Sequence, residues 1–350
     1  MPIHTLPGKE GPMKIPMVSS ANTFLKTGTL VIAFVLVASI VSQKKVNKSE
    51  GLEVENLNDK YQDMARKLKK AFMQKKEWKS DLKQQKIKKK ADLNTKKTQS
   101  KTFVIDFIGD LRASASASLR EEVSAILEVA DDDDEVIVRL DNHGGVVHEH
   151  GLAASQLIRI RKRGINLSVC VDKVAASGGY LMACVANKIY AAPFAILGSI
   201  GVIAQLPNFN RLLDTHGVDF EEITAGKFKR DVTMFGKNTD ADRAKLKEQL
   251  EEVHELFKSS ITEYRSSLDI NKVSNGEYWH GTRALELGVA DEIKTSDELL
   301  TERSKDRDIF RVSYKFKKSF QKKFLASIDG VIVKFTDVRW KKWFESRLPR

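Results

Sequence analysis

The sequence Val174-Ala175-Ala176-Ser177-Gly178-Gly179-Tyr180 lies between two apolar runs and governs the interpretation of the whole chain. The strand-like run Leu167–Val171 precedes it, and a helix-like run continues after it to Val185. A serine among small residues at a strand-to-helix turn is typical of an acyl-transfer nucleophile, because a substrate backbone can approach closely and the following N–H groups can stabilise an oxyanion. A turn that only packs a strand against a helix has the same composition. Ser177 is therefore the first candidate catalytic residue.

Strand-like and helix-like segments alternate around this turn. The strands are expected at Phe103–Phe107, Val136–Leu140, Leu167–Val171 and near Ile189-Tyr190, and the helices at Leu119–Ala130, Leu152–Lys162, Thr239–Ser267 and Thr282–Leu287. Strands that alternate with helices of this length indicate β-α units and a mostly parallel sheet. The predicted fold class is α/β.

The N-terminal part of the chain predicts a membrane anchor. Residues 1–26 form a flank rich in proline and glycine, and residues 27–43 carry no charged side chain. This apolar stretch approaches the length of about 20 residues that spans a bilayer. A cleavable signal peptide is the alternative, but the flank is long and the cleavage pattern poor for one. Positive charges balance on the two sides, so the positive-inside rule does not fix the orientation.

The net charge of +12 is concentrated in one segment. Between residues 60 and 101 there are 16 Lys and Arg against 4 Asp and Glu, which equals the whole excess. Residues 44–101 are therefore predicted to form a basic helical spacer, which is either solvated or in contact with anionic membrane lipid. No nucleic-acid partner is expected, because the basic footprint lies outside the predicted globular domain.

The predicted globular domain covers residues 102–300, and residues 301–350 form a basic, aromatic C-terminal extension. This extension could lie on a membrane surface, pack on a partner subunit or cover the core of its own domain. Cys170 and Cys184 lie in apolar runs and are interpreted as buried hydrophobic residues. No metal site or cofactor is predicted, because no Cys/His spacing resembles a zinc site and the Asp131–Glu135 run is expected to be a solvated loop.

A serine needs a base, and the residues alone leave its identity open. None of the seven histidines lies in a compelling motif, although His143, His148 and His150 cluster after the second strand. A desolvated lysine is the other option. The lysine candidates are Lys173, Lys188, Lys227 and Lys229.

A second glycine turn, Asn142-His143-Gly144-Gly145, follows the second strand of the predicted sheet. Parallel neighbouring strands end at the same edge of a sheet, where sites in open α/β folds form. N–H groups of Gly144 or Gly145 and of Gly178 could therefore converge on one oxyanion.

Together with Gly198-Ser199-Ile200-Gly201-Val202 and Thr224-Ala225-Gly226-Lys227-Phe228-Lys229-Arg230, these turns resemble the signal peptide peptidase A family, in its single-domain bacterial type. The resemblance covers residues 102–297 and extends to the anchor and Lys-rich spacer before them. It implies a Clp/crotonase-like fold and a Ser–Lys dyad, in which Ser177 is the nucleophile and Lys229 the general base, with Lys227 as the nearest rival. It also implies an oxyanion hole from Gly144, Gly145 and Gly178, and a pocket floor at Ser199. The family's turn is usually Ser-Pro-Gly-Gly, so Asn142-His143 is a departure that allows a different hydrogen-bond arrangement.

The function implied by this resemblance is that of a membrane-anchored serine endopeptidase acting on peptide or protein substrates, such as signal-peptide remnants or membrane-protein segments. The family further implies a single-pass bacterial inner-membrane protein with a periplasmic catalytic domain and a homo-oligomeric assembly. Two alternatives remain: an acyl-CoA enzyme on the related crotonase fold, and a non-catalytic membrane scaffold.

Overall fold

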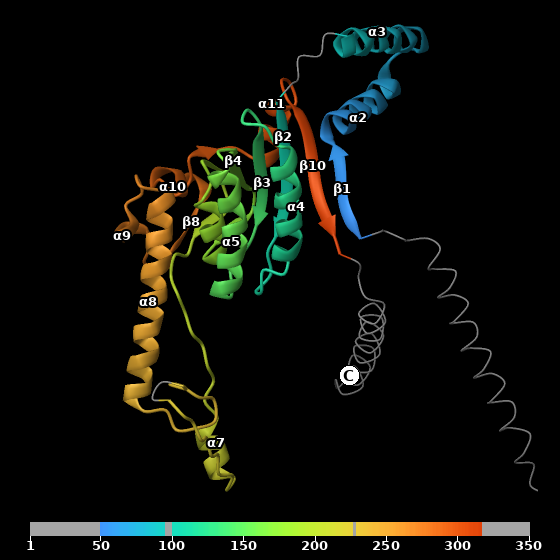
Figure 1. Cartoon of the computed structure of the whole chain (residues 1–350). Helices are drawn as coiled ribbons and strands as arrows, with labels where there is room; N and C mark the ends of the chain where they lie inside the picture. The colour runs from blue at the N-terminus through green and yellow to red at the C-terminus, as the bar shows by residue number, and fades with distance from the viewer. Residues whose placement is uncertain (1–49, 95–99, 227–228, 317–350) are drawn as a thin grey trace, which may run out of the picture. The chain divides into compact units, whose positions relative to one another are not determined.

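The computed structural model describes residues 50–94, 100–226 and 229–316, and Gly51–Phe316 form one compact unit (Figure 1). The predicted anchor at residues 27–43 and most of the predicted C-terminal extension lie outside the described residues. Within the described ranges, no helix has the length and apolar character needed to cross a membrane.

The main sheet has seven strands in the order β1-β10-β2-β3-β4-β6-β9. Every neighbouring pair is parallel except β1 and β10, which are antiparallel. The strands are β1 (Gly51–Asn56), β2 (Lys101–Ile108), β3 (Glu135–Asp141), β4 (Asn166–Val171), β6 (Lys188–Ala191), β9 (Glu292–Ile293) and β10 (Asp308–Lys315). The predicted parallel α/β fold is confirmed for this part of the chain.

Successive side chains of a strand point to opposite faces of the sheet, and helices pack against both faces. Ile105 and Val138 pack in the larger core with α4 (Ser116–Val129) and α5 (Val147–Lys162), which lie side by side in Figure 1. The intervening residues, such as Val104, pack in a second core with α2 (Leu57–Phe72) and α11 (Ser296–Arg303). The central residues of β2 and β3 are buried on both faces of the sheet, which explains the apolar runs Phe103–Ile105 and Val136–Val138.

A smaller three-stranded sheet carries the candidate nucleophile. It consists of β5 (Val174–Ala176), β7 (Ile196–Gly198) and β8 (Tyr278–His280), with β5 and β7 parallel and β8 antiparallel to β7. The short helix α6 (Gly178–Ala183) follows β5 after the single residue Ser177. The remaining helices are α3 (Lys75–Asn94), α7 (Asn210–Thr215), α8 (Asp240–Tyr264), α9 (Ile270–Val273) and α10 (Gly281–Glu286).

The sheet extends past both predicted domain boundaries, at residues 102 and 300. β10 pairs in parallel with β2 and buries Ile309 and Val312, while β1 pairs with β10 from Gly51 opposite Lys315 to Asn56 opposite Phe310. The residues predicted as the start of the basic spacer and of the C-terminal extension therefore belong to the folded unit. Val54 falls within the predicted helical spacer but lies in β1, and the helix begins at Leu57.

Candidate active site

Ser177 occupies a strained turn between β5 and α6. Its backbone has φ 52° and ψ −121°, a conformation that residues other than glycine rarely adopt. The turn is held because the Ser177 N–H donates to the Gly198 carbonyl oxygen at 2.8 Å. Strain of this kind costs on the order of 1–3 kcal/mol and concentrates at functional sites. A serine at a sharp strand-to-helix turn exposes its hydroxyl in the way that nucleophile elbows do.

The glycine turn after β3 packs directly against this serine. Asn142 is completely buried and pairs with β5, since its N–H donates to the Val174 carbonyl at 2.8 Å and its carbonyl accepts from the Ala176 N–H at 3.0 Å. Gly144 has φ +85°, and a Cβ atom there would lie 2.8 Å from the Ser177 Cβ atom. Only glycine therefore fits this contact between the two turns.

The backbone N–H groups of the three predicted oxyanion-hole glycines differ in their partners. The Gly144 N–H donates to the Asn142 Oδ1 atom at 2.9 Å, inside the turn. The N–H groups of Gly145 and Gly178 make no hydrogen bond to another described residue. Gly178 is the first residue of α6, where helix N–H groups lack an intrahelical acceptor. Gly145 and Gly178 therefore keep the donors that an oxyanion would need.

His150 lies beneath both turns. From the sequence it was only one of several histidines that could serve as a base. The side chain is fully buried on α5, and a Cβ atom at Gly178 would lie 2.5 Å from its ring. The ring Nδ1 atom is 3.0 Å from the Val146 carbonyl oxygen, and Nε2 is 3.2 Å from the Asn142 Oδ1 atom. Both nitrogens are thus engaged away from Ser177. The available sequence signal was the place of His150 in the histidine cluster after the second strand.

Ser199 lies beside the nucleophile because β5 and β7 are in register. Ala176 pairs with Gly198, so Ser177 and Ser199 are the residues that follow one matched pair. Ser199 also has a positive φ of 51°, and its N–H donates to the Glu277 carbonyl at 2.6 Å. The structure therefore brings Ser177, Gly144, Gly178 and Ser199 together.

Lys229 is not joined to Ser177 by any hydrogen bond or ion pair among the described residues. It is exposed, and its N–H donates to the Gly226 carbonyl at 3.1 Å. The described residues on either side of it contact one another and α8: the Phe209 N–H donates to the Met234 carbonyl at 2.7 Å, the Phe209 and Phe235 rings stack at 6.0 Å, and Asp231 accepts from the Gln249 side chain at 2.9 Å. Lys227, the rival base, lies outside the described residues.

The two cysteines lie in the core. Cys170 and Cys184 are free and buried, and burial raises the pKa of the Cys184 thiol to about 12 and that of Cys170 further. Neither thiol can serve as a nucleophile at neutral pH. The described residues hold no cluster of three or more His, Cys, Asp or Glu suited to a metal ion.

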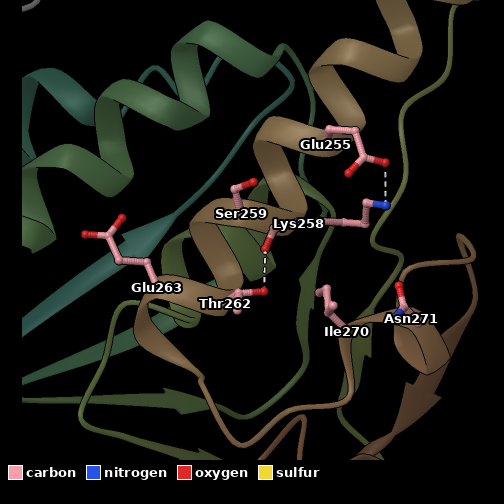
Figure 2. A pocket seen from close by; sticks show the side chains of 7 residues that line it. All are labelled: Glu255, Lys258, Ser259, Thr262, Glu263, Ile270 and Asn271. Atoms are coloured by element: carbon pink, nitrogen blue, oxygen red, sulfur yellow. Dashed lines mark hydrogen bonds and ion pairs between the residues drawn. The ribbon is translucent and has the colours of Figure 1, made fainter.

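A surface depression of about 440 Å³ lies away from these residues, between α8 and α9 (Figure 2). Lys258 points towards Glu255 in Figure 2, and the two form an ion pair at 2.5 Å on its wall. None of its lining residues belongs to the predicted site. The shape of the surface therefore does not by itself locate the chemistry.

Residues 17–157 match the description "Peptidase family S49 N-terminal", and residues 159–309 match "Peptidase family S49". The "Probable protease SohB" of Haemophilus influenzae is 45% identical over 310 residues, which cover 84% of this chain and 88% of that protein. The "Probable protease SohB" of Buchnera aphidicola subsp. Acyrthosiphon pisum is 53% identical over 237 residues, or 68% and 70% of the two chains.

Among solved structures, a mutant of the membrane-bound stomatin-specific protease 1510-N in complex with a substrate peptide aligns with a TM-score of 0.42 and 15% identity. The alignment covers 66% of this chain and 98% of that one. The resemblance to the signal peptide peptidase A family is confirmed by the family matches and the close relatives. The chain belongs to peptidase family S49, a family of serine peptidases.

Proposed function

We propose that this serine peptidase is a membrane-anchored endopeptidase that works through a dyad of Ser177 and Lys229. The observation that carries the proposal is the Ser177 turn, in which a serine with φ 52° packs against the Gly144 turn, near the N–H groups of Gly145 and Gly178 that have no partner among the described residues. Donors fixed beside a nucleophile stabilise the charge that develops in acyl transfer.

The reaction follows from these groups. The Lys229 amine takes the proton of the Ser177 hydroxyl as the oxygen attacks the peptide carbonyl carbon, and the N–H groups of Gly145 and Gly178 bind the resulting oxyanion. Collapse of this intermediate breaks the C–N bond, and the lysine returns the proton to the departing amine. Water then attacks the acyl-enzyme by the same steps. Ser199, at the neighbouring strand end, shapes the floor of the pocket.

An amine acts as a base at neutral pH only when it is desolvated, and Lys229 is exposed in the single chain. We propose that a homo-oligomer supplies this burial. The segment around Lys229 supports the proposal, because apolar side chains such as Leu212, Val218 and Ile223 are more than half exposed there. Exposed apolar side chains concentrated in one segment are a feature of surfaces that pair with another subunit.

The anchor is residues 27–43, in contact with membrane lipid, and the catalytic domain lies on the periplasmic side of a bacterial inner membrane. The uncharged sequence supports the anchor. The substrates are peptides in an extended conformation, such as signal-peptide remnants or membrane-protein segments. Reporter fusions at the two ends of the chain test the orientation, and a cytoplasmic catalytic domain would contradict this assignment.

The dyad is tested by replacing its members one at a time in the full chain and measuring casein or peptide hydrolysis. Ser177→Ala and Lys229→Ala should each lower kcat by at least about a thousandfold. Lys227→Ala tests the rival base, and Lys237→Ala is the matched control, an exposed lysine in the same part of the chain. Full activity in Lys229→Ala together with loss in Lys227→Ala would reassign the base.

The oligomer is tested with Ile223→Asp, which places a charge at a residue that is 95% exposed. Light scattering after size exclusion should then report a smaller particle than for the wild type. Phe194→Asp, at an exposed apolar residue outside the segment, is the control. An unchanged particle mass in Ile223→Asp would remove the support that this surface gives.

A further inference from the structure

The Asn142-His143 departure from the family pattern raises the question of what fixes the oxyanion turn without a proline. The side chain of Asn142 holds this turn through a hydrogen bond. Its side-chain oxygen Oδ1 accepts the Gly144 N–H at 2.9 Å, and this bond orients the turn that leads to Gly145. An Asx-type bond of this kind stabilises a local turn. The conformation of the turn therefore depends on the position of the Asn142 side chain.

The Asn142 side chain is itself held by His150. The amide is completely buried, with its Nδ2 atom donating to the Met182 Sδ atom at 3.3 Å and its Oδ1 atom 3.2 Å from the His150 Nε2 atom. The Gly144 N–H fixes which end of the amide is oxygen, because only the oxygen accepts. The His150 Nε2 atom therefore faces an acceptor and forms a hydrogen bond only when it carries a proton.

The other nitrogen of the His150 ring faces a carbonyl that already has a partner. Nδ1 lies 3.0 Å from the Val146 oxygen, and the same oxygen accepts the backbone N–H of His150 at 3.1 Å in the first turn of α5. The Val146 oxygen therefore stays satisfied when Nδ1 is unprotonated. The Asn142 Oδ1 atom likewise has the Gly144 N–H, so each oxygen keeps a donor in either tautomer, and what a proton on Nε2 adds is a buried hydrogen bond from α5 to the Asn142 side chain.

The ring also supports the second half of the oxyanion hole. A Cβ atom at Gly178 would lie 2.5 Å from the His150 ring, so the ring packs directly on the backbone of that residue. One side chain thus contacts the Gly178 peptide by packing and the Gly144 turn through Asn142.

We propose that His150 is a positioning residue for peptide hydrolysis, whose Nε2–H donates to Asn142 Oδ1 and thereby fixes the Gly144-Gly145 turn beside Ser177. It acts through Asn142 and does not touch the substrate. This inference rests on the proposed reaction at Ser177, and it assigns a role to a histidine that the Ser–Lys chemistry leaves unused.

The test compares two variants of the full chain. His150→Phe fills the space against Gly178 but has no donor, whereas His150→Gln supplies an N–H donor from a longer, flexible side chain. Removing an oxyanion donor outright costs about 10²–10³ in kcat, so a loosened turn should cost on the order of tenfold or more. We expect His150→Phe to lower kcat by that factor with KM within about twofold, and His150→Gln to recover most of the loss.

The matched control is His148→Phe, which removes a histidine that is 83% exposed in the same helical turn. It should match the wild type. Wild-type kcat in His150→Phe, or equal losses in His150→Phe and His150→Gln, would overturn the proposal. If the wild type shows no hydrolysis that Ser177→Ala abolishes, the proposed function fails instead, which is a different result.

A measurement on the wild type decides the case even where the variants do not fold. Side-chain ¹⁵N NMR of histidine-labelled full chain, with the His150 signal assigned by difference from variants that replace the other histidines, reports which ring nitrogen carries the proton. We expect a protonated Nε2 at neutral pH. A ring protonated only at Nδ1 cannot donate to Asn142 and would overturn the proposal.

Discussion

Glu122 gives the sharpest stability prediction. Its side chain is 5% exposed on α4, and its Oε1 atom accepts the Tyr314 N–H of β10 at 2.7 Å. Burial raises the pKa of this carboxyl from its ordinary 4.5 to about 7, with Asp106 adding to the rise and the Tyr314 hydrogen bond opposing it. The folded state therefore binds a proton that the unfolded state has already lost between pH 4.5 and 7.

The sign of the pH effect follows from proton linkage. Below pH 4.5 both states are protonated at Glu122, and the group makes no difference. From pH 4.5 to 7 the unfolding free energy falls by about 1.4 kcal/mol for each pH unit, and above 7 the loss is complete at about 3 kcal/mol. Glu122→Gln keeps the acceptor oxygen for Tyr314 and removes the ionisation. The variant should equal the wild type at pH 4 and be more stable by up to about 3 kcal/mol at pH 8.

Urea unfolding of the full chain in detergent, followed by tryptophan fluorescence from pH 4 to 8, measures this difference. Glu128→Gln is the matched control, because Glu128 is exposed on the same helix. A stability difference between Glu122→Gln and the wild type that stays constant across this pH range would refute the reasoning.

Two further predictions concern packing around the site and beneath the sheet. Gly144→Ala should lower kcat at least a hundredfold in peptide hydrolysis, because its Cβ atom would lie 2.6 Å from the Ala176 oxygen. Gly151→Ala, with nothing within 4 Å of the added Cβ atom inside α5, should raise stability in thermal unfolding by about 0.5–1 kcal/mol without changing kcat. Equal kcat values for the two variants would contradict the contact at Gly144. Arg265 is 8% exposed and donates two hydrogen bonds to the Asp291 carboxylate, at 2.7 and 2.8 Å. Asp291→Asn leaves the Arg265 charge without its partner and should lower the free energy of unfolding in urea by about 3 kcal/mol. A loss below about 1 kcal/mol would show that water replaces the partner of Arg265.

The central part of the fold was accessible from the sequence because its signals are local. The strands predicted at Phe103–Phe107 and Val136–Leu140 are apolar apart from Asp106 and Arg139, and both lie inside observed strands that extend one or two residues further at each end. β1 was missed because it is an edge strand with alternating exposure, and its partner β10 lies more than 250 residues away in sequence. Its apolar residues also fit the helical spacing of α2, which follows immediately.

The candidate site was accessible only in part. The Ser177 and Gly144 turns could be paired from the sequence, because parallel strands place their ends at one edge. The positive φ of Ser177 and the chain of contacts from His150 through Asn142 could not, since they depend on how β3, β5 and α5 approach one another. The role of Lys229 stays a prediction, because no sequence pattern determines how its segment meets the serine.

The antiparallel pairing of β1 with β10 has a mechanical consequence. Gly51 lies opposite Lys315, so the chain enters and leaves the folded unit at the same end of one strand pair, with the two backbones about 5 Å apart. A pull between the two ends of the protein would load the hydrogen bonds of this pair one after another, as in a zipper, and not all at once. The β1 strand would peel away first, while the buried parallel strands that carry Ser177 and the glycine turn remain outside the path of the force. Under such a force the β1–β10 pair would therefore separate before the catalytic part of the domain unfolds.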